Sequence, residues 1–229
     1  MSDVSQVLIP FSYLGGVNLK LLLVQGELEL LSTGYALQRF DNGFQVNTIN
    51  KDTHAIMHLY QFCIDNGIDL LARIASQSPI SMGEIESYSA YCGVNRETGE
   101  RVGAGYYGQR MRIAWAYIKW LWLFYQNRTK FSLDKLKASK IQFSHMELAF
   151  SLYLKAPYKT PKKDRIGLTL ELRKRFFEII NPLPANELNP WKQGKVRWRN
   201  YALFLTMILG GNRKGESLLL KLNHFELTG

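Results

Sequence analysis

Residues 106–127 read Tyr106-Tyr-Gly-Gln-Arg-Met-Arg-Ile-Ala-Trp-Ala-Tyr-Ile-Lys-Trp-Leu-Trp-Leu-Phe-Tyr-Gln-Asn127, with no proline and no glycine beyond Gly108. Apolar side chains recur here at helical spacing: Met111, Ala114, Trp115, Ile118, Leu121, Trp122 and Tyr125. That period predicts a helix of about six turns whose apolar and aromatic face lies in a core. Arg110, Arg112 and Lys119 stand between the apolar positions. Arg112 and Lys119 are seven residues apart, so they share one side of the helix, as a basic edge suited to phosphate contacts.

Two more helices are predicted on the N-terminal side of this run. Apolar residues at helical spacing begin near Thr48 and stop at Asn66-Gly67, a pair typical of a helix C-terminus. Ser81-Met-Gly-Glu84 has the form of a capping box, and the helix that it starts should end at Gly93. Before them, residues 21–30 predict a short hairpin with its turn at Gly26, and residues 35–40 predict a helical turn.

On the C-terminal side, residues 155–167 contain two prolines and five cations and show no periodicity, which is the composition of an exposed linker. Beyond it, Thr169 should cap a helix, a second apolar helix should run from Trp198 to Leu209, and a further one should carry residues 216–222. The expected fold class is therefore mainly α. Residues 1–45 form a short β or irregular arm, residues 46–154 a helical domain, and residues 168–229 a second helical region after the linker.

The charge is distributed unevenly along the chain. The net charge is +10, but residues 1–100 carry five Lys or Arg against eleven Asp or Glu, whereas residues 101–229 carry twenty-four against eight. A strongly positive half attracts a polyanion, and the binding should weaken steeply as salt is added. Charge by itself does not separate DNA from RNA or from an acidic membrane, and a solvated basic face is the plainer alternative.

Composition and motifs exclude several classes of protein. The 229 residues are 46% hydrophobic, enough for packed cores, and no apolar run is long enough to cross a membrane. Cys63 and Cys92 have no neighbouring cysteine or histidine cluster, so they predict reduced packing residues of a cytoplasmic protein, without a disulfide or a zinc site. Gly103-Ala-Gly-Tyr-Tyr-Gly108 fits a dinucleotide-binding pattern but follows no hydrophobic strand. His54 and His58 are one helical turn apart with no third metal ligand in view. We expect neither a metal nor a cofactor.

The most specific pattern lies near the C-terminus. Arg197-Trp-Arg-Asn-Tyr-Ala-Leu-Phe-Leu-Thr-Met-Ile-Leu-Gly-Gly-Asn-Arg213-Lys-Gly-Glu216 is an apolar helix, a glycine break and an arginine with a glutamate three residues later. This resembles the first catalytic-arginine box of tyrosine recombinases, the phage-integrase family. The upstream Gly167-Leu-Thr-Leu-Glu-Leu-Arg173 resembles the start of that family's catalytic domain. Residues 48–67 and 106–127 are similar to the first and last main helices of its SAM-like core-binding domain.

The resemblance covers about residues 46–229 and implies a DNA strand-exchange enzyme. Arg213 would be the first catalytic arginine, whose guanidinium holds two non-bridging oxygens of the scissile phosphate, and Glu216 its supporting partner. The core-binding helices and the basic linker would meet double-stranded DNA through phosphate contacts from Arg110, Arg112, Lys119, Lys162 and Lys163. The resemblance further implies a homotetramer on DNA in the full-length form, whereas we expect a monomer without DNA.

The sequence departs from the family pattern in two respects. Gly210 and Asn212 replace the usual residues around the glycine, and the family's lysine, His-x-x-Arg box and tyrosine nucleophile have no counterparts here. We therefore expect this chain to bind DNA without cutting it. One alternative is a catalytically inert helical nucleic-acid-binding or regulatory protein, in which Arg213 has no role. Another is an RNA-binding or adaptor protein.

Overall fold

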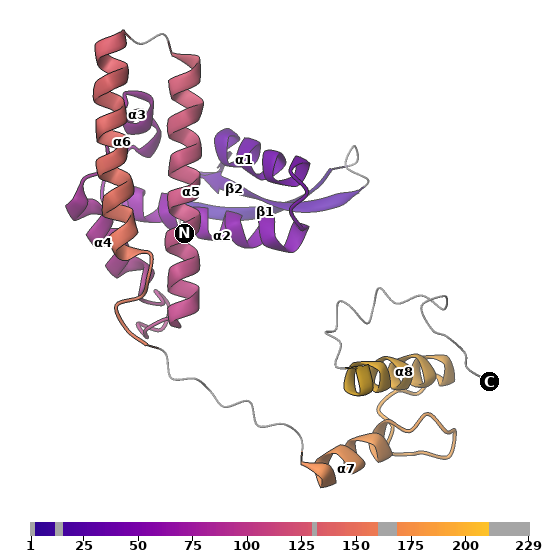
Figure 1. Ribbon diagram of the computed structural model, residues 1–229. Helices are drawn as coiled ribbons and strands as arrows, with labels where there is room; N and C mark the ends of the chain where they lie inside the picture. The colour runs from indigo at the N-terminus through magenta and orange to yellow at the C-terminus, as the bar shows by residue number, and fades with distance from the viewer. Residues whose placement is uncertain (1–2, 12–15, 130–131, 160–168, 211–229) are drawn as a thin grey trace. The chain divides into compact units, whose positions relative to one another are not determined.

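The computed structural model describes residues 3–11, 16–129, 132–159 and 169–210. Eight helices and three strands lie in these ranges, so the described chain is mainly helical with a small antiparallel sheet (Figure 1). The chain divides into two compact units, Met1–Pro161 and Lys162–Gly229. The expected boundary between residues 45 and 46 falls inside the first unit. Arg213, Glu216, Lys162 and Lys163 lie outside the described residues.

The N-terminal sheet has the order β1-β2-β3, with β1 at Val4–Phe11, β2 at Val17–Val24 and β3 at Glu27–Leu28. The expected turn is present, because Val24 pairs with Glu27, and Gln25 and Gly26 both have positive φ, as a tight two-residue hairpin requires. The predicted second strand of that hairpin is too long, however, since Leu30 already begins helix α1, Leu30–Asp41. The main partner of β2 is β1, which the sequence analysis did not anticipate.

The sheet and α1 pack against α2, Val46–Asp65. Leu19 and Leu21 of β2, Ala36 of α1 and Ile49 of α2 form a small buried cluster between them. The side chain of Arg39 on α1 also reaches Asp52 on α2, with an Nη2–Oδ2 distance of 2.7 Å. The segment expected to be an arm is therefore held in the first unit by packing and by an ion pair.

Four further helices complete the first unit: α3 Leu70–Ala75, α4 Met82–Cys92, α5 Ala104–Arg128 and α6 Leu133–Tyr153. The predicted capping box is confirmed: Ser81 Oγ accepts from Glu84 N, and a Glu84 carboxylate oxygen accepts from Ser81 N. The apolar face predicted for residues 106–127 is also confirmed in the main, since Met111, Ile118 and Trp122 are fully buried. Helices α3 and α6 are additions to what the sequence predicts.

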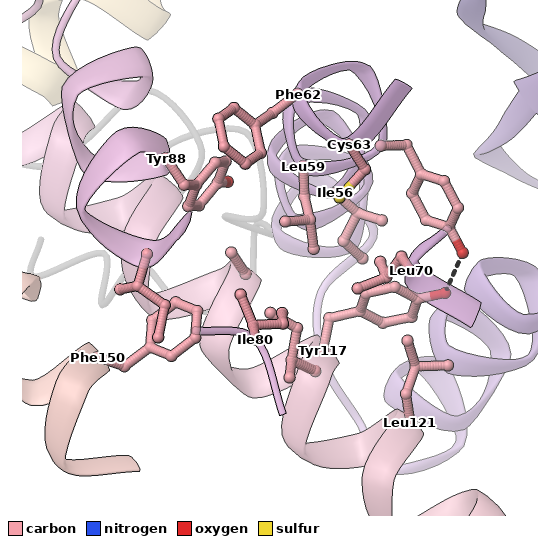
Figure 2. Packing of buried hydrophobic residues seen from close by; sticks show 14 of the residues in the cluster. Ile56, Leu59, Phe62, Cys63, Leu70, Ile80, Tyr88, Tyr117, Leu121 and Phe150 are labelled. Carbon is pink, nitrogen blue, oxygen red and sulfur yellow. Dashed lines mark hydrogen bonds between the residues drawn. The ribbon is translucent and has the colours of Figure 1, made fainter. Parts of the chain in front are cut away.

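The main core lies between α2, α4, α5 and α6 (Figure 2). Ile56, Leu59 and Cys63 of α2 meet Tyr88 of α4 there, and α5 and α6 contribute Tyr117, Leu121 and Phe150. Tyr117 and Tyr60 share a buried hydrogen bond of 2.9 Å between their hydroxyl oxygens. Cys63 and Cys92 are both free and buried, and burial raises the pKa of each thiol to about 12. Neither cysteine is therefore a reactive thiolate at neutral pH.

The predicted linker begins inside the first unit. Tyr158 donates a hydrogen bond of 2.9 Å to the carbonyl of Val102, and Ala156 packs against the main core. Residues 155–159 therefore belong to the first unit, and the remainder of the predicted linker, residues 160–167, lies outside the described residues.

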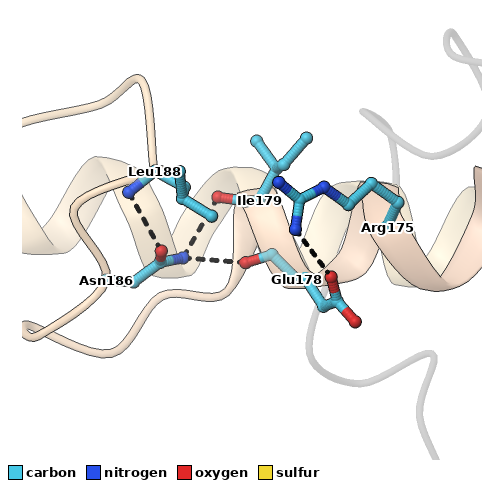
Figure 3. Close-up of polar contacts among 5 residues, drawn as sticks. All are labelled: Arg175, Glu178, Ile179, Asn186 and Leu188. Carbon is cyan, nitrogen blue, oxygen red and sulfur yellow. Dashed lines mark hydrogen bonds and ion pairs between the residues drawn. The ribbon is translucent and has the colours of Figure 1, made fainter.

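The described part of the second unit consists of α7, Leu170–Ile180, and α8, Gly194–Gly210. Thr169 caps α7 as predicted, with its hydroxyl accepting from Leu172 N at 3.2 Å. Asn186 closes the other end of the helix, donating from its side-chain amide to the carbonyls of Glu178 and Ile179 and accepting from Leu188 N (Figure 3). Phe176 and Phe204 join α7 to α8 in an edge-on contact.

Candidate nucleic-acid interface

Two of the predicted DNA contacts, Arg112 and Lys119, lie on the flank of α5 beside α6. Both side chains are exposed. Lys119 Nζ is 3.6 Å from Glu147 Oε1 on α6. The Arg112 guanidinium lies close to Gly108, so that a Cβ atom added to this glycine would be 3.1 Å from Arg112 Nη1. The seven-residue spacing does place the two cations on one side of the helix. This flank already provides Lys119 with a carboxylate partner.

The third predicted contact, Arg110, is only 6% exposed and lies on a different side of α5. Its Nη1 donates to the carbonyl of Cys92 at 3.1 Å, which satisfies the C-terminal end of α4. Its Nη2 is 3.0 Å from His58 Nε2, and its guanidinium carbon is 4.4 Å from the centre of the Tyr106 ring. The Nε atom is buried and has no hydrogen-bond partner among the described residues. Arg110 therefore ties α5 to α2 and α4.

The electrostatic effect of Arg110 is visible at two histidines of α2. Burial lowers the pKa of His58 to about 3, and the charge of Arg110 is the next cause. The ring is therefore neutral at physiological pH, and its Nε2 can accept from the guanidinium. Burial also lowers the pKa of His54, followed by the charges of Arg110 and Lys20. The rings of His54 and His58 touch edge to face, 4.9 Å between centroids.

A cleft of about 700 Å³ opens beside this arrangement, between β2, the N-terminal half of α2 and the first turns of α5. We call it the cationic cleft. It is lined by Lys20, Asn47, Asn50, Lys51, His54, Ala55, Tyr106, Gln109 and Arg110. None of these described lining residues is Asp or Glu, whereas three of them are cations and three are amides. Such a lining can attract an anion and donate hydrogen bonds to it.

Folding brings the parts of the cleft together from distant places in the chain. Leu19 and Leu21 are buried on one side of β2, so Lys20 between them points outward, and its backbone N–H donates to Asn50 Oδ1 at 2.8 Å. Sequence reasoning missed Lys20 and Lys51, because both lie in the half of the chain with a net negative charge. The alternation along β2 is the signal that could have exposed Lys20.

A neighbouring cleft of about 510 Å³ shares His54, Tyr106 and Arg110 with the first but has a different charge. It also contains Glu97 and Arg96. The Arg96 guanidinium is engaged by Asp65 at 3.0 Å and by the Tyr91 hydroxyl at 2.9 Å. In this second cleft the charge of Arg96 is therefore paired within the protein, and the carboxylate of Glu97 would oppose an anion.

The second half of the chain carries many exposed cations over both units. Of the exposed Lys and Arg side chains that the structure describes after residue 100, only Lys119 and Arg175 have an ion-pair partner. The exposed cations are Arg101, Arg112, Lys119, Arg128, Lys135, Lys137, Lys140, Lys155, Lys159, Arg173, Lys174, Arg175, Lys192, Lys195 and Arg199. The other thirteen cations of this list, on either unit, have no ion-pair partner among the described residues.

The described ranges give little support to a metal site or to a dinucleotide-binding site. They contain no group of three or more His, Cys, Asp or Glu side chains placed to hold a metal ion. The motif Gly103–Gly108 forms the N-cap and first turn of α5. None of the described helices is both long and apolar enough to cross a membrane. Comparisons of the chain with protein-family models, with curated proteins and with solved structures found no match.

Proposed function

We propose that this chain is the DNA-binding portion of a site-specific tyrosine recombinase. The observation that carries DNA binding is the surface of exposed cations after residue 100, most of which have no ion-pair partner among the described residues. When such cations neutralise the phosphates of a nucleic acid, the counterions condensed on the nucleic acid are released, and this release favours binding. The distribution of these cations over both units fits a protein that grips a duplex with two domains joined by a basic segment.

The recombinase assignment rests on the sequence boxes and on how far the fold agrees with them. The two segments that resemble core-binding helices are helical, as α2 and α5, and Thr169 is the N-cap of α7 in the segment that resembles the start of the catalytic domain. The long apolar helix before the Arg213 box is α8. In this proposal residues 46–154 include a SAM-like core-binding domain and residues 168–229 begin the catalytic domain.

In the proposed reaction, the full-length enzyme exchanges DNA strands through a covalent phosphotyrosine intermediate. Arg213 holds the non-bridging oxygens of the scissile phosphate, where charge develops, and Glu216 orients the guanidinium. Arg112, Lys119, Lys162 and Lys163 contact backbone phosphates, and the protein assembles as a homotetramer on two duplexes. Arg110 would contact a phosphate from the wall of the cationic cleft, because its buried side chain lies there and not on the flank of α5 that carries Arg112 and Lys119.

Binding of a fluorescent DNA duplex, followed by anisotropy across a salt series with an RNA duplex of equal length as competitor, tests the proposal. We expect tight binding at low salt, a steep loss with added salt and preference for DNA. Equal affinity for both duplexes would favour an RNA-binding or adaptor protein. A shallow salt dependence with weak binding would favour an inert helical scaffold.

A further inference from the structure

The cationic cleft has the features of an anion-binding site. We infer that it binds a phosphate ester, and that in the DNA-bound protein this group is a phosphate of the DNA backbone. The second clause rests on the proposed function, whereas the chemistry of the ligand rests on the cleft itself. The residues that line the cleft come from β2, α2 and α5 of the first unit, elements that Figure 1 labels.

Arg110 in the wall of the cleft carries a charge that no anionic group among the described residues balances. A buried cation is normally paired with an anion, because leaving water is costly for a charged group. The partners of Arg110 are the carbonyls of Cys92 and Val94, the neutral ring of His58 and the face of Tyr106, none of which carries a full negative charge. Its Nε has no partner among the described residues. A bound anion would supply the missing charge.

The remaining lining residues extend this positive field to the outside. Lys20 and Lys51 are exposed, and neither has an ion-pair partner among the described residues. His54 lies in the same lining, and its pKa is lowered by burial first and then by the charges of Arg110 and Lys20. The side-chain amides of Asn47 and Gln109 add neutral hydrogen-bond donors for phosphate oxygens.

The size and make-up of the cleft favour a phosphate ester over a simple carboxylate. Its volume of about 700 Å³ is that of a site for a small organic molecule or a nucleotide. Three cations exceed what one carboxylate would neutralise, but they suit a chain of phosphates. Tyr106 is 41% exposed at the cleft, so its ring offers an apolar surface to a sugar or a base.

A charge-neutralising pair of variants tests the inference. Lys20→Gln with Lys51→Gln removes the two outer charges without touching the buried Arg110. Lys20→Arg with Lys51→Arg is the matched control, because it changes the same two positions of the cleft and keeps their positive charge. The probes are a fluorescent DNA duplex, a deoxynucleoside monophosphate and inorganic phosphate. The readouts are duplex affinity across a salt series and the NMR signals of the His54 and His58 rings.

We expect the cleft variant to lose on the order of tenfold in duplex affinity at 0.1 M salt per lost contact, and its salt slope to fall by about 0.9 for each. The control variant should change both quantities less. Duplex and mononucleotide should shift the His54 signal in the wild-type protein. A wild-type protein that binds the duplex, with a cleft variant that binds equally well, overturns the cleft site and leaves the proposed function standing.

The remaining outcomes show whether the cleft site can stand when the proposed function fails. If the wild-type protein does not bind the duplex, the proposed function fails. A His54 shift with the mononucleotide or with phosphate, absent in the cleft variant, would then support a site for a free phosphate ester. The lack of any shift with all three probes would overturn the cleft site as well.

Discussion

His58 should make the stability of the first unit depend on pH, because its ring is held neutral beside Arg110. The pKa of His58 is lowered to about 3 by burial first and by Arg110 second. In the unfolded chain a histidine takes up its proton near pH 6.5. As the pH falls below that value, His58 binds a proton in the unfolded state but not in the folded state. The contribution of the neutral His58 ring to the free energy of unfolding should therefore be fully present above about pH 6.5 and decrease as the pH falls towards 3.

The size of the effect follows from proton linkage. A histidine that stays fully neutral in the folded state costs at most about 2 kcal/mol between pH 7 and pH 5. His58 is half-buried, so solvent screens its surroundings, and we expect roughly 1 kcal/mol. His54, whose pKa is also lowered, should contribute in the same direction.

Urea unfolding at pH 7 and pH 5, followed by tryptophan fluorescence at constant ionic strength, measures this dependence. His58→Gln keeps an acceptor for Arg110 Nη2 but cannot take up a proton, so its loss of stability between the two pH values should be smaller than that of the wild type. His145→Gln, at an exposed position on α6, is the control. If His58→Gln shows the same pH dependence as the wild type, the folded state does protonate His58 and the reasoning about Arg110 is wrong.

Further predictions concern packing, capping and reactivity. Trp122→Ala should destabilise the first unit by about 3–5 kcal/mol, measured by urea unfolding, because the indole is fully buried. Asn186→Ala should destabilise the second unit by about 1 kcal/mol in the same assay, since the Ile179 carbonyl loses its donor, whereas the carbonyls of Glu178 and Asn181 keep a bond from Asn181 N and Asn189 Nδ2. Neutralising Arg112 and Lys119 together should reduce the salt slope of duplex binding by up to about 1.8, and an unchanged slope would remove the α5 flank from the interface. The chain should form no covalent adduct with a nicked suicide substrate, and a trapped adduct on a denaturing gel would contradict this.

The elements that the sequence predicts well are those specified by local interactions. The capping box at Ser81, the Thr169 cap and the apolar face of α5 all depend on residues within a few positions of one another. Helix α6 was missed, because Ile141, Leu148 and other apolar residues lie on its exposed side and obscure its period. Strand β1 was missed as well, because it contains a proline, which argues against a strand. The residues of β2 that pair with it lie in a separate segment, so local sequence does not reveal the pairing.

The candidate site was harder to predict than the fold, since its residues meet only in three dimensions. Spacing along α5 places Arg110 with the other cations, but its contacts to Cys92 and His58 bury it. Counting charges over halves of the chain directs attention away from Lys20 and Lys51, which folding brings next to α5. The expected roles of Arg213 and Glu216 lie outside the described residues and stay predictions.

The salt dependence of duplex affinity is the measurement that decides whether this protein binds DNA through its exposed cations, as we propose. Anisotropy of a labelled duplex between low and physiological salt gives the number of phosphate contacts from the slope. We expect tight binding at low salt and a slope equivalent to several contacts, with an RNA duplex competing poorly. Weak binding with a shallow slope, or equal competition by RNA, would contradict the proposal.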